Sequence, residues 1–496
     1  MSDGSLSGVL FPEVEGRRST TETGRAIFAD AAAPIDKGLA ERISSCAKWR
    51  GEYLVHVRDL TAASAADANA PVEIASAGLD SMRARMTFER DGQVIPVSGA
   101  GSPGLGRENM TETLTIKGTG TPIEQLLVPY EGADLSGDEL VDQLRTWVER
   151  GTVEPSFAGA IERVIENPEW LSVPGRRLAL LGAASEMGPY EPLLAWGADL
   201  IAIDIPRPSI WEHLLEVAAG SAGRVALPVR GGAAPIAERA GIDLREDLPE
   251  TIAWIEEAAG SDPLVIGTYA YLDGGPHVQV SVAADVLAEE MLNRRPGTAI
   301  AYLATPTDAF VVGPEVVAAA RRKWASRRLR AAAQAPLRLA SAGRLFHPSY
   351  ERQLPGGGGV ADALVPIQGP NYALAKRLQR WRGILARDAG HRVSFNVAPS
   401  SWTRSVTQNR ILAAAYSAGH HFGIEVFEPS TSRVLMAAML VHDLNYEGDS
   451  ARTPDAHPEE LFCEGANHGG LWRAAYEPRS ALSVAAIAGL PSTLRR

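Results

Sequence analysis

The chain has 496 residues and a formal net charge of −12, with 45% hydrophobic and 22% charged residues. This composition is that of a globular protein, and the length exceeds what one ordinary core supports, so we expect two or three domains. The negative charge argues against a nucleic-acid partner, because proteins that bind phosphate backbones neutralise them with basic surface.

The cysteines and the apolar stretches bear on the compartment of the protein. Cys46 and Cys463 stand near opposite ends of the chain without ligand-like spacing to other residues, so we expect neither a disulfide framework nor a metal site. The N-terminus lacks the apolar core of a signal peptide, and no stretch approaches about 18 uninterrupted apolar residues, the length that a membrane helix needs. We therefore expect a cytoplasmic protein with no membrane partner.

The first third of the chain mixes several patterns. Residues 1–25 are rich in Ser, Gly, Thr and Glu and are expected to form a flexible arm. Residues 26–172 are expected to form a smaller α+β domain that ends in a helical bridge. Its predicted elements are a helix at 35–49, strands at 53–57 and 86–89, and two helices within 136–171.

From residue 173 to the C-terminus, short apolar stretches alternate with amphipathic helical stretches. This alternation is typical of βαβ units and predicts an α/β fold with a doubly wound, Rossmann-type parallel sheet. Residues 313–360 interrupt the alternation with a basic helix and a glycine run, which we interpret as an insertion. The seven predicted strands are 177–181, 199–203, 224–229, 263–268, 298–303, 392–397 and 461–463.

A glycine turn follows the first of these strands. In RLALLGAASEMGPYEPLLAWGADLIAIDI, Gly182, Ser185 and Gly188 stand between an apolar strand and a helix, and the next strand ends at Asp204. Such a turn presents backbone N–H groups to a pyrophosphate, and a carboxylate about 20 residues further on can accept the ribose hydroxyls. The spacing predicts a dinucleotide site that prefers NAD to NADP, because Asp204 would repel a 2′-phosphate.

Tyr372 and Lys376 stand four residues apart in PNYALAKRLQRW, ahead of the predicted strand in RVSFNVAP. Residues at this spacing share one face of a helix, so the Lys376 ammonium can lie near the Tyr372 phenol and lower its pKa. The phenol could then pass a proton while a hydride moves between a nicotinamide and a carbon atom. The pair therefore predicts an acid–base site.

Together, the glycine turn, the Tyr-x-x-x-Lys pair and the VAP strand resemble a divergent short-chain dehydrogenase/reductase over about residues 176–470. The resemblance implies that Lys376 also holds the nicotinamide ribose. It implies that Thr403, in the loop that begins at Pro399, meets the carboxamide of the cofactor. It also implies a homodimer or a homotetramer.

The chain departs from the family at several positions. Glu186 stands where the turn has its middle glycine, and the serine that precedes the tyrosine in the family falls on Gly359. Thr305 and Thr307, which follow the fifth predicted strand, could replace that serine as donors to a substrate carbonyl, or could cap the next turn. His277, at the expected edge of the sheet, is interpreted as a helix cap or a surface residue.

These patterns favour an NAD(P)-dependent oxidoreductase that interconverts an alcohol and a ketone or aldehyde through Tyr372 and Lys376. Its expected cofactor is NAD, and its expected substrate is a small molecule. An S-adenosylmethionine-dependent methyltransferase stays open as an alternative, because its first strand, glycine turn and acidic second-strand end look alike. A catalytically degenerate Rossmann module that binds a nucleotide or serves assembly is a third interpretation, favoured by Glu186 and Gly359.

Overall fold

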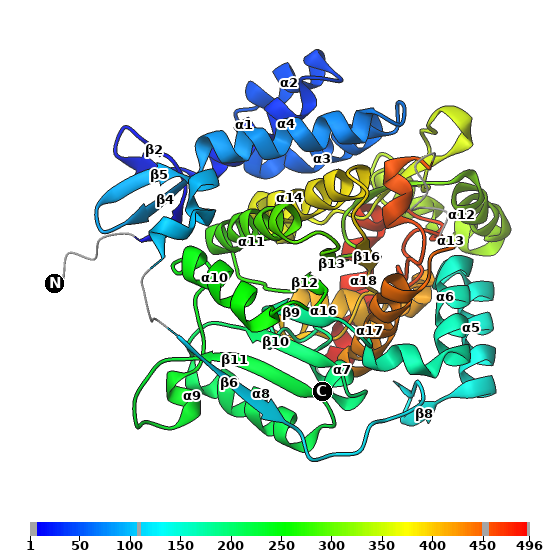
Figure 1. Ribbon diagram of the computed structural model, residues 1–496. Coiled ribbons are helices and arrows are strands. Elements are labelled where there is room, and N and C mark those ends of the chain that lie inside the picture. The colour runs from blue at the N-terminus through cyan, green and yellow to red at the C-terminus, as the bar shows by residue number, and fades with distance from the viewer. Residues whose placement is uncertain (1–6, 107–110, 449–455, 494–496) are drawn as a thin grey trace.

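In the computed structural model, which describes residues 7–106, 111–448 and 456–493, the centre of the protein is a seven-stranded sheet (Figure 1). All neighbouring strands run parallel except the last pair, which is antiparallel. In spatial order the strands are β16 (Val393–Val397), β13 (Ala299–Ala304), β12 (Leu264–Thr268), β9 (Arg177–Leu181), β10 (Asp199–Ile203), β11 (Arg224–Val229) and β6 (Glu112–Lys117).

The six parallel strands confirm the predicted Rossmann-type sheet. Numbered along the chain from β9, they lie in the order 6-5-4-1-2-3, which is the order of the doubly wound dinucleotide-binding fold. Three of them, β9, β10 and β11, have the predicted bounds; β12 and β16 begin one residue later than predicted, and β13 is shifted by one residue at both ends. Ligands of such sheets bind where the strand order reverses, which here is between β9 and β12.

The seventh strand is not the predicted one. Residues 461–463 were expected to form a strand, and instead they lie within and just after the 3-10 helix η8 (Pro458–Phe462). The helix is fixed by Glu459, whose carboxylate accepts hydrogen bonds from Arg380 and Ser64 while Phe462 is buried. The sheet gains its seventh strand from β6, which precedes the predicted sheet region and pairs with the opposite edge.

Helices cover both faces of the sheet, because side chains of each strand point alternately to two hydrophobic cores. Leu181 and Ile203 belong to one core, and Leu180 and Ala202 belong to the other. The first core packs under α10 (Leu248–Ala259), α11 (Gly275–Arg294) and α14 (Gly369–Asp388). The second packs under α5 (Gly137–Arg150), α6 (Pro155–Glu166), α7 (Tyr190–Ala195), α8 (Pro208–Gly220) and α17 (Pro429–Asn445).

The N-terminal helices form a further layer on α14 (Figure 1). These helices are α1 (Thr20–Ala32), α2 (Lys37–Ser44), α3 (Trp49–Ser64) and α4 (Ala70–Arg85). The layers touch closely: a Cβ added at Gly78 of α4 would lie 2.5 Å from the ring of Trp381 on α14. Because these helices share the first core with the sheet, the predicted smaller N-terminal α+β domain is not confirmed.

Several predictions for the first 100 residues are wrong in detail. The predicted strand 53–57 is part of α3, since Tyr53, Val57 and Leu60 bury one helical face. The predicted helix 35–49 is present only as α2 and the first residue of α3. The strand predicted at 86–89 is confirmed as β4 (Thr87–Arg90), which pairs with β1 (Gly8–Leu10) and β5 (Gln93–Pro96).

The expected flexible arm contains ordered elements. Residues 1–6 lie outside the described part of the chain, but β1 follows them directly, with Val9 and Leu10 buried. Helix α1 begins within the expected arm, where the Ser19 hydroxyl accepts a hydrogen bond from the amide of Glu22. Burial of apolar side chains and a helix cap therefore fix this segment.

The two helices predicted within 136–171 are α5 and α6. The insertion begins and ends in a hairpin of β14 (Ala309–Val312) and β15 (Gly359–Asp362), between which lie α12 (Pro314–Ser326) and α13 (Arg328–Ala340). It packs on the C-terminal segment, where the Tyr350 hydroxyl donates to the Trp472 carbonyl at 2.6 Å. The remaining elements are β2 (Glu13–Val14), β3 (Arg17–Arg18), β7 (Val128–Tyr130), β8 (Ala133–Leu135), α9 (Ile236–Arg239), α15 (Arg404–Thr407), α16 (Arg410–Ser417) and α18 (Pro478–Thr493).

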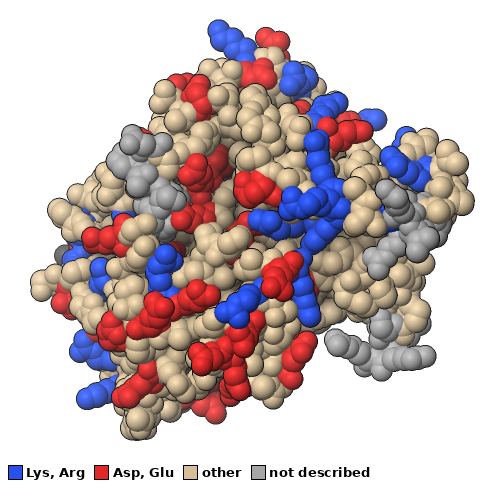
Figure 2. All heavy atoms as spheres, turned by 90° about the vertical axis from the view of Figure 1, so that its right-hand side faces the viewer, with Lys and Arg blue, Asp and Glu red and all other residues tan. Residues whose placement is uncertain are grey.

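Two further features concern the surface. On the face that Figure 2 presents, a stripe of Lys and Arg side chains is bordered by Asp and Glu, so basic charge does not stand alone there. None of the described helices is both long and apolar enough to cross a lipid bilayer.

Candidate active site

The candidate site lies at the carboxyl edge of the parallel strands. The glycine turn follows β9, Tyr271 and His277 follow β12, and Thr305 follows β13. The loop that begins at Pro399 follows β16, and α14 brings Tyr372 beside the end of β13. Residues from separate parts of the sequence thus meet where doubly wound sheets bind their ligands.

The predicted glycine turn is present between β9 and α7. Gly182 has a φ of +82°, and a Cβ there would lie 2.5 Å from the backbone N and Cα of Ala270, so only glycine fits. The turn is closed by its own backbone: the Ser185 amide donates to the Gly182 carbonyl at 3.0 Å, and the Gly188 amide to the Ser185 carbonyl at 2.8 Å.

Asp204, at the end of β10, is bonded to this turn. Its two carboxylate oxygens accept hydrogen bonds from the amides of Ala184 at 2.9 Å and Ile205 at 2.8 Å. Burial raises the pKa of Asp204, and the two amides act in the opposite direction. The contact of Asp204 with a cofactor ribose remains a prediction. A ribose hydroxyl bound there would share the carboxylate with the amides of Ala184 and Ile205.

Glu186 connects the turn with the loop after β16. Its carboxylate accepts a hydrogen bond from the Arg404 amide at 3.0 Å, and its carbonyl accepts one from Arg433 Nε at 3.0 Å. The carboxylate therefore points to the loop that carries Thr403. Pro399, at the start of that loop, is buried, and the Thr403 hydroxyl lies 3.0 Å from that of Ser405.

The turn offers donors to an anionic dinucleotide under one condition. Among the hydrogen bonds between described residues, the amides of Glu186 and Met187 donate to no acceptor, and Arg433 adds a guanidinium at the same turn. The contact between Glu186 and Arg404 joins the two segments between which the family resemblance places the cofactor. A dinucleotide would fit the donors of the turn once this contact opens.

Tyr372 lies against hydroxyl groups at the end of β13. Burial raises the pKa of Tyr372 above its usual value, while the nearby Thr305 hydroxyl acts in the opposite direction. The hydroxyls of Thr305 and Thr307 are 2.8 Å apart, and Thr307 accepts from Gln368 Nε2 at 2.6 Å. The two threonines therefore form a chain of hydroxyls that starts at the phenol.

Lys376 lies on the same face of α14 as Tyr372, as predicted, but it points to the ring and not to the hydroxyl. Its Nζ is 5.9 Å from the centroid of the Tyr372 ring and donates to the Leu303 carbonyl and to Gln379 Oε1, both at 3.1 Å. Burial lowers the pKa of Lys376 to about 8. The expectation that Lys376 lowers the pKa of Tyr372 is wrong in this arrangement, because burial dominates and raises it.

His277 was not predicted to belong to the site. It is 1% exposed near the start of α11, and its ring stacks on that of Tyr372 with centroids 5.6 Å apart and lies 4.9 Å from the centroid of Tyr271. Its Nε2 atom is buried without a partner among the described residues. Burial, with the charge of Lys376, lowers the pKa of His277 to about 3, so the imidazole is neutral. The interpretation as a cap or surface residue is wrong, because β12 and α14 enclose this position.

Two acidic side chains near the edge take other roles. Asp308 is buried and pairs with Arg377 at 2.8 Å, so it fixes α14 to the hairpin of the insertion. Asp273 is exposed and accepts a hydrogen bond from the Tyr271 hydroxyl at 2.8 Å. Both carboxylates therefore have partners away from Tyr372.

Two cavities among the described residues lie away from this site. One of about 430 Å³ is lined by His420, His421 and the end of α18, and one of about 250 Å³ by Glu154 and Cys463 among others. Comparison with known proteins adds no assignment: no family model matches the chain, and no curated protein matches it.

Proposed function

We propose that this chain is an oxidoreductase that interconverts an alcohol and a carbonyl compound, with Tyr372 passing a proton to or from the substrate oxygen. The observation that carries the proposal is the position of the Tyr372 phenol next to Thr305, whose hydroxyl contacts that of Thr307. In this proposal the phenol is an acid beside two threonine hydroxyls that contact each other. Both lie at the carboxyl edge of the Rossmann-type sheet that also carries the glycine turn.

The protonation states follow from burial. Tyr372 is held as the neutral phenol, which donates a proton to a carbonyl oxygen more readily than it removes one from an alcohol. Thr305 and Thr307 give the resulting phenolate a path for a new proton, because their hydroxyls are already in contact.

The neutral imidazole of His277 has a positioning role in this proposal. Its ring stacks on Tyr372 at an interplanar angle of 24° and limits how the phenol can turn. Its unpaired Nε2 is available to a polar group of a small-molecule substrate.

The proposed cofactor is NAD, with NADP as the variant. When bound, it would supply or accept the hydride. The chain's own contribution would be the amides of Glu186 and Met187 toward the pyrophosphate and Asp204 toward the adenosine ribose. Lys376 and Thr403 would hold the nicotinamide end, and the preference for NAD rests on the charge of Asp204.

The first experiment is a fluorescence titration of the full chain with NADH, NADPH and S-adenosylmethionine. We expect NADH to bind, and to bind more tightly than NADPH. Binding of S-adenosylmethionine without NADH would favour the methyltransferase instead. Absence of binding by all three would favour a degenerate Rossmann module, for which the bridge between Glu186 and Arg404 is the best structural argument.

The second experiment removes one hydroxyl. Tyr372→Phe should leave NADH affinity unchanged and lower turnover of alcohols or ketones by roughly 10²-fold or more, the effect of losing a general acid. Tyr271→Phe is the matched control, because its ring lies 6.1 Å from that of Tyr372 but its hydroxyl is bonded to exposed Asp273. Undiminished turnover in Tyr372→Phe would exclude the proposed role.

A further inference from the structure

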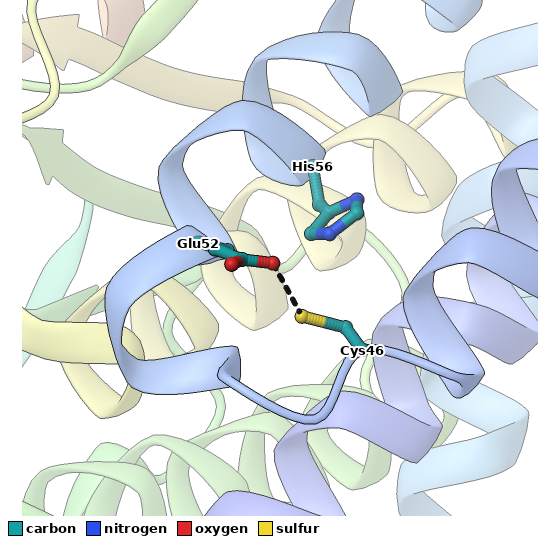
Figure 3. Close-up of side chains that lie close together, drawn as sticks. All are labelled: Cys46, Glu52 and His56. Atoms are coloured by element: carbon teal, nitrogen blue, oxygen red, sulfur yellow. Dashed lines mark hydrogen bonds between the residues drawn. The ribbon is translucent and has the colours of Figure 1, made fainter.

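The turn between α2 and α3 gathers three side chains of the kinds that bind transition metals (Figure 3). They are Cys46, in the turn itself, and Glu52 and His56, on α3. The Cys46 sulfur, a Glu52 carboxylate oxygen and a His56 ring nitrogen all lie within 4.8 Å of one another. None of the three takes part in the site proposed above.

The local fold explains why they meet. Glu52 and His56 are four residues apart, so one helical turn places them on the same face of α3. The Cys46 carbonyl accepts a hydrogen bond from Arg25 at 2.9 Å, which ties the turn to α1. Trp49 stacks on the His56 ring with centroids 5.7 Å apart and an interplanar angle of 19°, and so fixes the imidazole. Contacts outside the cluster therefore hold the turn of Cys46 and the ring of His56 in place.

The hydrogen bonding of the cluster is incomplete. The Cys46 thiol, a weak donor, donates to Glu52 Oε2 at 3.4 Å. His56 Nδ1 is buried and has no partner among the described residues, although buried polar atoms are usually paired. Burial lowers the pKa of His56, and imidazole nitrogens are common metal ligands in proteins. An unpaired ring nitrogen beside a thiol and a carboxylate is what an open coordination site presents.

We propose that Cys46, Glu52 and His56 bind one Zn²⁺ ion, with water as the fourth ligand. Zinc takes sulfur, nitrogen and oxygen ligands together, whereas Mg²⁺ and Ca²⁺ require oxygen ligands. With bond lengths of about 2.0–2.3 Å, a tetrahedral site needs donor atoms roughly 3.3–3.5 Å apart, so small side-chain rotations suffice. The Cys46 thiol gives up its proton to solvent on binding, and thiolate and carboxylate then balance the charge of the ion.

The position of the site suggests what the ion would do. Cys46 lies before α3 and the other two ligands lie on it, so the ion would fix the α2–α3 turn to the first two turns of α3. Between those ligands, the Tyr53 hydroxyl donates to the Val365 carbonyl at 3.3 Å, just ahead of α14. A metal here would stabilise the layer that covers the helix of Tyr372.

Cobalt substitution tests the proposal in the full chain. After treatment with a chelator, titration with Co²⁺ should give one ion per chain, tetrahedral d–d bands and a thiolate-to-cobalt charge-transfer band. Cys46→Ser should lose the charge-transfer band. Cys463→Ser, which removes the other cysteine, should keep it.

His56→Gln and Glu52→Gln should each weaken Co²⁺ binding by at least about 100-fold, since even outer-shell changes at metal sites cost 10–100-fold. Zn²⁺ should also raise the melting temperature of the wild-type chain and leave that of His56→Gln unchanged. Absence of the charge-transfer band in the wild type, or its survival in Cys46→Ser, would overturn the proposal. If Cys46→Ser does not fold, an unchanged Co²⁺ affinity in His56→Gln overturns it.

Discussion

Asp285 is the buried centre of a charge cluster that joins three helices. On α11, its carboxylate accepts hydrogen bonds from Arg382 Nε and Nη2 of α14 at 2.7 and 3.2 Å, and from Arg83 Nη2 of α4 at 3.1 Å. The side chains of Asp285 and Arg382 are 2% and 6% exposed. Asp285→Asn keeps the shape of the side chain and leaves two guanidinium groups facing a neutral amide.

The cost follows from burial. Removing one partner of a buried ion pair costs about 3–5 kcal/mol, because the remaining charge is desolvated without compensation. Glu289 lies 3.0 Å from Arg83 and 3.3 Å from Arg382 and retains part of the attraction. We therefore expect the free energy of unfolding to fall by about 3 kcal/mol, at the lower end of that range.

Urea denaturation, followed by circular dichroism, measures this loss. Asp142→Asn is the matched control, because Asp142 pairs with Arg145 on the surface, where the two side chains are 75% and 63% exposed. That change should cost less than about 1 kcal/mol. A loss below about 1 kcal/mol in Asp285→Asn as well would refute the claim that α4, α11 and α14 are joined through a buried charge.

Two further predictions concern the candidate site. Glu186→Gln should tighten NADH binding roughly fivefold, because one unit charge a few ångströms from a phosphate is worth about 1 kcal/mol at the surface. Glu191→Gln, which removes the charge of a carboxylate that pairs with Arg433, is compared in the same titration. Burial lowers the pKa of Lys376 to about 8. Between this pH and about 10.5 the unfolded chain therefore binds more protons than the folded chain, so the free energy of unfolding should rise with pH in this range. Lys376→Met should lack this rise in denaturation curves taken at each pH, and equal pH dependence in the two proteins would contradict the burial of the ammonium.

The sheet could be predicted because its signal is local. Strands such as LVIGT (β12) and RLALL (β9) are buried on both faces, so each is a continuous apolar run between turns, and six of the seven strands were predicted. Strand β6 was missed, because ETLTIK is an exposed edge strand whose partner, β11, lies more than 100 residues further on. No short-range pattern can identify such a pairing.

The residues of the candidate site also divide into those that depend on near neighbours in the sequence and those that depend on distant ones. The turn at Gly182 and the shared helix face of Tyr372 and Lys376 could be predicted from spacing, since turns and helix faces are set by near neighbours, whereas Thr305 was considered only through the family resemblance. His277 could not be identified, because its burial depends on α14, which follows it by almost 100 residues. The cluster around Cys46 was missed for a related reason: His56 fell in the predicted strand 53–57 and Glu52 just before it, and residues four apart in a strand lie about 13 Å from each other.

The pairing of β6 with β11 also bears on how the protein is made and handled. The ribosome releases β6 long before its partner strand, so this pairing is a late, non-local event in folding. A fragment that starts at residue 173 would leave the amides and carbonyls of β11 unpaired along an open edge, where strands of other copies can add. It would also lack the helices that cover α14. Expression of the Rossmann half alone should therefore yield aggregates, and co-expression of residues 1–172 as a separate chain should recover soluble protein.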